Sequence, residues 1–360
     1  MAKLNVKEST MTKFLQEILE QPITLRNTLD FYTSGEGEDK LRRALDLFQS
    51  NQDTNIILTG MGSSYFAPYA VSCFLSKFGI NAPVYNASEL LHYQTSLLKK
   101  NTLLVLISQS GESYEIVQLL DAIPDGCKTI AITNEISSTL GSGSDLVLPC
   151  KAGKEEMTST KTFVATILVA LILGWHLVDA FHQTKVDQLR KMINDFEIFL
   201  SSSSQWIDAT MTFLDTFKFI EFIGRGPAFP AAQQSALMVK EVNRMASESL
   251  LGGEFRHGPI EMVRDGFICV VFAPVGKTHP QSQAITGDII KFGGKVLQIT
   301  DSIERYNDPN VHTIKLPGID EFLFSIPAIV PIQLIVNALA VKNNIDPGHF
   351  VHGAKVTKIE

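Results

Sequence analysis

Three serines, a glutamine and a glycine stand together in SQSGES at residues 108–113, directly after the apolar run Leu103–Ile107. The run predicts a strand buried on both faces, and the spacing of Ile116, Leu119 and Leu120 predicts a helix after the loop. The first N–H groups of a helix lack intrahelical partners and carry partial positive charge, so hydroxyls beside them form a phosphate cradle. A serine that only caps the helix is the alternative. Three hydroxyls in one loop favour the cradle.

The elements that position this loop alternate between strand and helix, which predicts parallel, doubly wound sheets in an α/β fold. The expected strands are 55–59, 82–85, 103–107, 128–132 and 146–148, then 218–223, 268–272, 296–300 and 311–315. The expected helices are 8–33 with a break at Pro22, 39–49, 65–78, 89–98, a short one within 134–140, 163–178, 185–200, 228–245, 280–292 and 326–341. Residues 34–37 (SGEG) are expected to break the chain before the second of these helices.

The two halves of the chain repeat one another. Gly60-Met61-Gly62 and Gly224-Arg225-Gly226 each follow an expected strand and open an expected helix, which indicates a tandem duplication. Neither copy completes the dinucleotide pattern G-x-G-x-x-G, because Tyr65 and Phe229 stand where the third glycine belongs. We therefore exclude NAD binding. The expected domains are an N-terminal helical segment (1–34), a first domain (35–200), a second domain (205–345) and a tail (346–360).

Composition narrows the class of protein. The 360 residues carry a net charge of −7 with no basic stripe, which argues against a nucleic-acid partner. The four cysteines are far apart, and no cysteine or histidine set has metal-ligand spacing, so a reducing compartment and no metal are expected. The N-terminus has no signal-peptide core, and the apolar run 163–178 is too short to span a bilayer. We expect a cytoplasmic protein with no membrane contact and a buried helix at 163–178.

Six stretches, in order along the chain, resemble the sugar isomerase (SIS) domain family. They are GMGSSY at 60–65, SQSGES at 108–113, TNEISSTL at 133–140, TSTKTF at 158–163, KEVNRMASESLLGGEFRHGP at 240–259 and AKVT at 354–357. Within the family the likeness is to the isomerase half of glutamine–fructose-6-phosphate transaminase and to stand-alone glucosamine-6-phosphate deaminase-like proteins. It covers nearly the whole chain. It implies two tandem SIS units, each a doubly wound five-stranded parallel sheet flanked by helices.

The resemblance places the substrate at the loop described first. By position, it assigns phosphate binding to Ser64, Ser108, Gln109, Ser110 and Ser113, and sugar binding to Ser63, Thr158 and Ser159. The last two have an alternative role as caps of the apolar helix. The implied partner is a sugar phosphate, and the implied assembly is a homodimer.

The resemblance also implies catalytic roles for Glu241, His257 and Lys355. Glu241 matches the glutamate that moves a proton between C1 and C2. His257 matches the histidine that opens the sugar ring from the neighbouring subunit, and Lys355 matches the lysine of a tail that closes over the sugar. Such chemistry needs one shielded carboxylate and one group that titrates near neutrality, and no cofactor.

Each of these three residues has a structural alternative. Glu241 could be a solvated helix residue, with Glu248 and Glu254 as nearby competitors for its role. His257 could cap the turn that precedes Gly258-Pro259. Lys355 could be an ordinary lysine of the tail.

The chain also departs from the transaminase pattern. Met238 stands where the synthase has a second lysine, and methionine forms no Schiff base and carries no charge. His349 and His352 lie in a tail that is longer than the synthase tail, and they either reach the sugar or are solvated. No glutaminase half with its cysteine nucleophile precedes residue 60, so we do not expect ammonia to be drawn from glutamine.

Three functions remain open at this stage. The first is deamination of an amino-sugar phosphate such as glucosamine 6-phosphate, or cleavage of an amino-acid adduct of a sugar phosphate, to give a ketose phosphate. The second is aldose–ketose isomerisation of a phosphosugar without nitrogen chemistry. The third is a non-catalytic sugar-phosphate sensor. We favour the first, because the resemblance implies deamination for a two-SIS chain of this kind without a glutaminase half. Glu241 and His257 are both present and no DNA-binding module is attached, which argues against the sensor.

Overall fold

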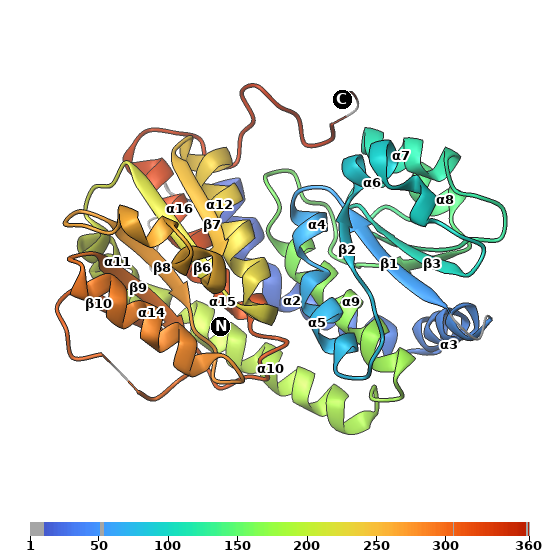
Figure 1. Ribbon diagram of the computed structural model, residues 1–360, viewed down its shortest axis with the longest axis horizontal. Coiled ribbons are helices and arrows are strands. Elements are labelled where there is room, and N and C mark those ends of the chain that lie inside the picture. The colour runs from blue at the N-terminus through green and yellow to red at the C-terminus, as the bar shows by residue number, and fades with distance from the viewer. Residues whose placement is uncertain (1–10, 51–53, 305, 358, 360) are drawn as a thin grey trace. The chain divides into compact units, whose positions relative to one another are not determined.

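The computed structural model describes residues 11–50, 54–304, 306–357 and 359 (Figure 1). The chain forms two compact units. We call Gln21–Lys191 with Phe350–Glu360 the first-sheet unit, and Met1–Glu20 with Met192–His349 the second-sheet unit. Part of the expected N-terminal helix, residues 8–10, lies outside the described residues.

The first-sheet unit holds a five-stranded parallel sheet in the order β2-β1-β3-β4-β5 (Figure 1). Its strands are β1 Asn55–Gly60, β2 Val84–Asn86, β3 Thr102–Ile107, β4 Lys128–Thr133 and β5 Leu146–Pro149. Its helices are α2 Gln21–Tyr32, α3 Gly35–Gln49, α4 Ser63–Phe66, α5 Tyr69–Ser76, α6 Ala87–Tyr93, α7 Tyr114–Asp121, α8 Thr139–Gly143, α9 Lys161–Leu177 and the start of α10 Gln183–Ser201.

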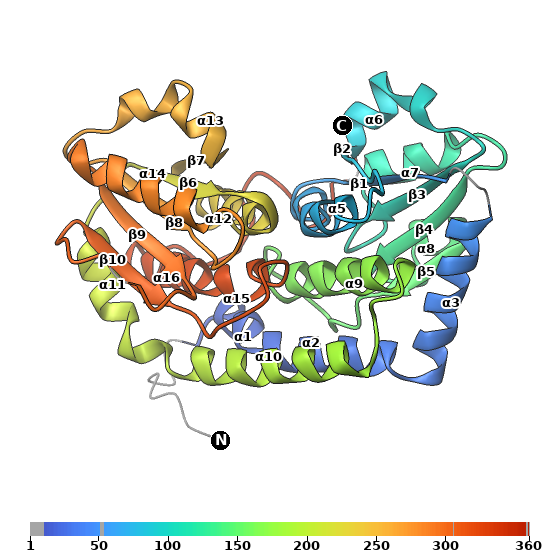
Figure 2. The same cartoon turned by 60° about the horizontal axis from the view of Figure 1, so that its bottom comes forward.

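The second-sheet unit repeats this plan with the strand order β10-β9-β8-β6-β7, again all parallel (Figure 2). Its strands are β6 Phe219–Gly224, β7 Ala246–Leu251, β8 Ile268–Phe272, β9 Lys295–Thr300 and β10 Val311–Lys315. Its helices are α1 Lys13–Leu19, the end of α10, α11 Ile207–Leu214, α12 Phe229–Asn243, α13 Gly252–Arg256, α14 His279–Lys291, α15 Ser325–Ala328 and α16 Val330–Lys342. The predicted fold of two doubly wound five-stranded sheets is confirmed.

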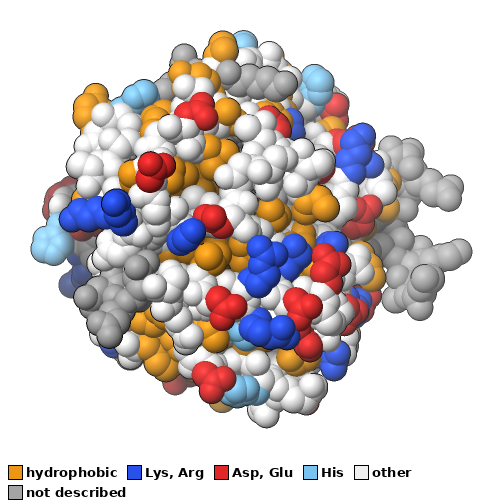
Figure 3. Space-filling model, turned by 90° about the vertical axis from the view of Figure 1, so that its right-hand side faces the viewer, with side chains coloured by type: hydrophobic (Ala, Val, Ile, Leu, Met, Phe, Trp, Pro, Cys, Tyr) orange, Lys and Arg blue, Asp and Glu red, His pale blue; other side chains and the backbone are white. Residues whose placement is uncertain are grey.

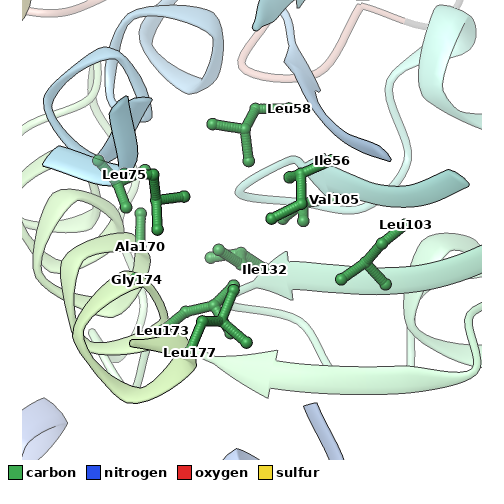
Figure 4. A pocket seen from close by; sticks show the side chains of 11 residues that line it. Ile56, Leu58, Leu75, Leu103, Val105, Ile132, Ala170, Leu173, Gly174 and Leu177 are labelled. Atoms are coloured by element: carbon green, nitrogen blue, oxygen red, sulfur yellow. The ribbon is translucent and has the colours of Figure 1, made fainter. Parts of the chain in front are cut away.

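Both faces of the first sheet are covered by helices, because its strands are apolar on both sides. Alternate strand residues such as Leu104 and Leu106 pack under α6, α7 and α8. The residues between them, such as Leu103 and Val105, face α5 and α9 across a void of about 10 Å³ (Figure 4). Apolar side chains and Gly174 line this void, and a space of that size holds at most a water. It is a packing gap and not a sugar site.

The apolar helix α9 is a core element, as expected. Every residue from Lys161 to Trp175 is buried, and the helix packs on α2, α3, α5 and β4. Gly174 lets it approach α5, because a Cβ there would lie 2.3 Å from the Val71 side chain. Ser325–Lys342, which spans α15 and α16, is long and apolar enough to cross a membrane by length and composition, and 83% of it is buried within the protein. Buried core helices have the same length and composition, so this finding is weak evidence for a membrane span.

Several predicted boundaries were wrong, and the reasons are local. The break expected at 34–37 is shorter and lies at Thr33 and Ser34, because α3 already starts at Gly35 with Ser34 as its N-cap residue. Gly37 is required because a Cβ would lie 2.0 Å from the Phe31 carbonyl oxygen. The single helix expected at 65–78 is two helices, since Pro68 follows α4 and precedes α5. The helix expected at 326–341 is likewise divided into α15 and α16, with Pro331 in the first turn of α16.

Strand β7 and helix α11 were not expected at all. The β7 sequence ASESLL is polar at three of its first four residues, and the strand forms the edge of its sheet beside β6. Pairing with β6 along six residues, from Phe219 with Ala246 to Gly224 with Leu251, therefore stabilises a segment whose own β-propensity is low.

Candidate functional site

The predicted phosphate loop lies at the point of the first sheet where the strand order reverses. Strands β1 and β3 pair in register from Asn55 with Thr102 to Gly60 with Ile107, so the segments that follow them leave the same edge side by side. Ser63 and Ser64 begin α4 after β1, and residues 108–113 follow β3. Open α/β sheets bind ligands at such a switch point. The structure thus brings the predicted phosphate-binding residues of both segments to one edge.

Hydrogen bonds hold the loop after β3 in a defined conformation. The Ser108 hydroxyl accepts from the Gly111 N–H at 3.1 Å and lies 3.5 Å from the Ser113 hydroxyl. The Ser110 hydroxyl accepts from the Glu112 N–H at 3.2 Å. Gly111 has φ +66°, and a Cβ there would lie 2.0 Å from the Ser138 hydroxyl, so only glycine fits.

The loop carbonyls are turned towards the segment after β4. Gln109 O accepts from the Asn134 N–H at 3.2 Å, and Gly111 O accepts from the Leu140 N–H at 3.0 Å. The N–H groups of Gln109 and Ser110 donate to no other group in the described part of the chain. Two free N–H groups beside half-buried hydroxyls at the start of α7 form the donor set that an anion requires.

The segment after β5 brings the predicted sugar-binding residues to the same unit. Asn134 ties this segment to the end of β4, because its side chain bonds Gly153 O at 2.8 Å and the Ala152 N–H at 2.9 Å. Thr158 is buried, and the Ser159 hydroxyl lies 2.9 Å from that of Thr162 at the start of α9. The proposed capping role and the proposed sugar-binding role of Ser159 both remain compatible with this position.

The C-terminal tail reaches two parts of this unit. Lys355 Nζ donates to Glu155 Oε2 at 2.7 Å and to the Met157 carbonyl. Thr357 O accepts from the Tyr114 N–H, the first N–H of α7, at 3.0 Å. The predicted tail lysine is therefore anchored within the same unit as the phosphate loop, whereas His349 and His352 are exposed.

Glu155 is the residue of this region that the sequence analysis missed. Its side chain is fully buried in the ion pair with Lys355. The sequence signal is modest: a glutamate in a polar segment five residues before the Thr160 that precedes a long apolar helix. Only the fold shows that this glutamate turns inward.

The predicted proton-transfer residues lie in the second-sheet unit. Glu241 is half-buried near the C-terminal end of α12, one turn after the fully buried Met238. His257 follows α13 and is exposed. Its backbone N–H donates to Glu254 O at 2.9 Å, but its imidazole bonds no described residue, so it does not cap the turn through its side chain. The competing carboxylates Glu248 and Glu254 are exposed.

The charged side chains of the surface and the thiols differ in their surroundings. On the face of the protein shown in Figure 3, basic and acidic side chains are interspersed, and no single-sign patch forms there. Among the described residues, no three histidines, cysteines or acidic residues are grouped so that they could hold a metal ion. The four cysteines are free thiols, and burial raises the pKa of Cys127 to about 11 and that of Cys150 to about 12.

The sequence of the chain is similar to a known domain family and to curated proteins. The model of the SIS domain matches residues 50–174 and 217–342, which contain both sheets. Glutamine–fructose-6-phosphate aminotransferase (isomerizing) from Zymomonas mobilis is 27% identical over 373 residues, which cover 99% of this chain and 60% of that protein. The chain thus spans about three fifths of the length of the curated relatives that it matches.

Two solved structures share the fold over nearly the whole chain. Tagatose-6-phosphate ketose/aldose isomerase from Escherichia coli superposes with a TM-score of 0.77 at 22% identity, covering 97% of this chain and 98% of that one. Glucosamine-6-phosphate deaminase from Thermotoga maritima superposes with a TM-score of 0.75 at 22% identity, covering 96% of this chain and 99% of that one.

Proposed function

The chain belongs to the SIS domain family, and we propose that it is a phosphosugar-processing enzyme that deaminates an amino-sugar phosphate such as glucosamine 6-phosphate. The observation that carries the proposal is the donor set at the β1–β3 switch point. It offers a cluster of hydroxyls and two backbone N–H groups that donate to no described residue, and its segments 60–65 and 108–113 contain no lysine or arginine. Such a site suits a phosphate monoester, whose remote binding energy positions the reacting carbons.

The proposed reaction needs only the chain's own residues and water. After His257 assists ring opening, Glu241 takes the proton from C2 of the open aldehyde form and returns it to C1, while the amino nitrogen gives up one proton and O1 takes one up. The product is the 2-imine of fructose 6-phosphate. Addition of water to the imine carbon releases ammonia and leaves the ketose phosphate, so that atoms and charge balance. Glu241 is half-buried. This position suits a general base, which must be shielded from water and still reach the substrate.

Aldose–ketose isomerisation is the second candidate. The same proton transfer on a 2-hydroxy aldose gives a ketose without loss of nitrogen. Met238 supports this candidate. It is fully buried and uncharged at the position where the synthase has its second lysine, so the site lacks that lysine's nitrogen chemistry.

The decisive experiment measures ammonia and ketose phosphate together, with glucosamine 6-phosphate and glucose 6-phosphate as substrates. We expect equimolar ammonia and fructose 6-phosphate from the amino sugar. Fructose 6-phosphate from glucose 6-phosphate without ammonia from the amino sugar would select the isomerase. Tight binding of either sugar without turnover would select the sensor. A panel that includes fructose-6-phosphate–amino acid adducts tests the deglycating variant.

We also propose a homodimer in which His257 acts on the partner's substrate. The support is its exposed position and an imidazole that bonds none of the residues described by the structure. Mixing the inactive variants Glu241→Gln and His257→Ala should restore up to about a quarter of wild-type activity if each site combines one residue from each chain. Absence of any recovery in mixed dimers, confirmed by two affinity tags, would place both residues in one chain's site.

A further inference from the structure

Glu155 is a buried carboxylate with an unusually full set of donors. Its Oε1 accepts from the Thr160 N–H at 2.9 Å, the Thr160 hydroxyl at 3.2 Å and the Thr162 N–H at 3.0 Å. Its Oε2 accepts from the Thr162 hydroxyl at 2.6 Å and from Lys355 Nζ at 2.7 Å. A carboxylate with five donors is held in one orientation, and its negative charge lies at the positive end of α9.

The donors differ in what they provide. Four of them come from Thr160 and Thr162, so they are local and built into the start of α9. The fifth comes from Lys355, which is far away in sequence and supplies the only positive charge in the set. The Glu155 side chain is 0% exposed and that of Lys355 is 24% exposed, so the pair is largely shielded from water. Removing one partner would leave a buried charge without its counter-charge.

A second contact fixes the tail two residues further on. Thr357 O accepts from the Tyr114 N–H, and Tyr114 directly follows Ser113 of the phosphate loop. We call residues 354–357 the tail strap. It is held at Glu155 on one side and at the first N–H of α7 on the other.

We propose that Glu155 is a positioning residue that holds Lys355 as a paired ammonium, and that Lys355 acts as the anchor of the tail strap and not as a nucleophile or proton carrier. This inference rests on the proposed function only for the location of the substrate. An ammonium that donates to a carboxylate and to the Met157 carbonyl has no free lone pair with which to attack a sugar carbonyl. Anchoring places the strap beside the loop that holds the phosphate.

The anchor is tested first without substrate, by hydrogen exchange of the Tyr114 amide. Glu155→Gln and Lys355→Met should each speed this exchange by about tenfold or more, since a hydrogen-bonded ion pair no longer holds the strap. Lys355→Arg, which keeps the charge, should speed it less. The matched control is Glu156→Gln, which removes the exposed Lys154–Glu156 ion pair, 2.8 Å long, one residue away.

The outcomes of the exchange experiment are clear-cut. Lys355→Met leaves Glu155 and its four donors from Thr160 and Thr162 in place, so it remains informative if Glu155→Gln loosens α9. The proposed anchor is overturned if the Tyr114 amide of Lys355→Met exchanges at the wild-type rate. It is also overturned if Glu156→Gln speeds this exchange as much as Lys355→Met does. Neither result depends on the protein being an enzyme, so this experiment stands apart from the failure of the proposed function.

The chemical role of Lys355 is tested by sodium borohydride in the presence of fructose 6-phosphate. An imine between Nζ and the ketose carbonyl would form with loss of water, and its reduction to a secondary amine would add the mass of the sugar phosphate less one oxygen atom to the peptide that contains Lys355. We expect no such adduct. We also expect Lys355→Arg to keep turnover within about tenfold of wild type, and Lys355→Met to raise KM more than it lowers kcat. An adduct on Lys355, or an arginine variant as inactive as the methionine variant, overturns the proposal.

Discussion

The loops that follow β3 and β8 occupy equivalent places in the two sheets, but their N–H groups have different partners. After β3, the Gln109 and Ser110 N–H groups are free among the described residues. After β8, the Val275 N–H donates to Asp301 Oδ1 at 2.7 Å, and the Lys277 N–H donates to Glu321 Oε2 at 3.1 Å. The second sheet therefore satisfies its loop with the protein's own carboxylates.

This difference bears on where a phosphate could bind. Donors already bonded to carboxylates are not available to a phosphate, and the carboxylates themselves repel it. Gly276 allows the close approach, since a Cβ there would lie 2.2 Å from Glu321 Oε2. We infer one phosphate site per chain, in the first-sheet unit. Glu241 and His257, to which the proposed function gives the proton transfers, belong to the second-sheet unit.

The strands that pair with β3 and β8 also differ, because β1 is apolar at a position where β6 has a carboxyl group. Ile57 of β1 and Glu221 of β6 both stand three residues before the last glycine of their strand. Ile57 belongs to the apolar cluster under α6 and α7. Glu221 lies between Phe219 and Ile223, which face the cluster under α14, and no described side chain donates to its buried oxygens. Burial raises the pKa of Glu221 to about 8, and the Glu248 carboxylate adds to the shift.

The largest expected effect tests the division of labour between the two units. Glu241→Gln should lower kcat by about 10²–10⁴-fold, because the base is lost, while Kd for the sugar phosphate stays within about twofold. Steady-state kinetics and calorimetric titration measure the two quantities. The exposed Glu248→Gln serves as control and should keep full turnover. Equal loss in both variants would remove Glu241 from the proposed role.

The next effect concerns stability and its dependence on pH. The folded state binds the Glu221 proton more tightly than the unfolded state does, so the unfolding free energy should fall as pH rises from about 4.5 to about 8. Glu221→Ile, which introduces the residue type found at Ile57, should remove this dependence and stabilise the protein at pH 8 by on the order of a few kcal/mol. Urea unfolding of the wild type and of Glu221→Ile at pH 5 and pH 8 measures the unfolding free energies. A wild-type protein whose stability rises over this interval would contradict the burial of an unpaired carboxyl group.

The smallest effect tests the two loops directly. Ser110→Ala should weaken sugar-phosphate binding by about 1–2 kcal/mol, because one hydrogen bond to a charged group is lost. The matched control is Thr278→Ala in the loop after β8, which should leave affinity unchanged. Calorimetric titration of both variants with glucosamine 6-phosphate measures their affinities and shows which loop binds the phosphate. A stronger loss in Thr278→Ala would move the phosphate to the second sheet.

Much of the fold could be predicted because its signals are local. Buried runs such as Leu103–Ile107 and Ile268–Phe272 are apolar without alternation, and each is followed by small or polar loop residues. Strand β7 could not be predicted, because its polar residues become a strand only through pairing with β6. The start of α3 was missed for a similar reason. Gly37 is needed because the Phe31 carbonyl oxygen lies too close for a side chain, and not because the chain turns there.

The residue types around the candidate site were determined by the sequence alone. The serine cluster at 108–113, the glutamate at 241, the histidine at 257 and the lysine at 355 are visible in it, and so is the duplication that orders them. Tertiary structure decided which of these groups have partners. The sequence shows no difference between a loop whose N–H groups are free and one whose N–H groups bond Asp301 and Glu321. Nor does it show that Glu155 turns inward to hold Lys355, since hydrogen bonds between distant residues exist only once the chain has folded.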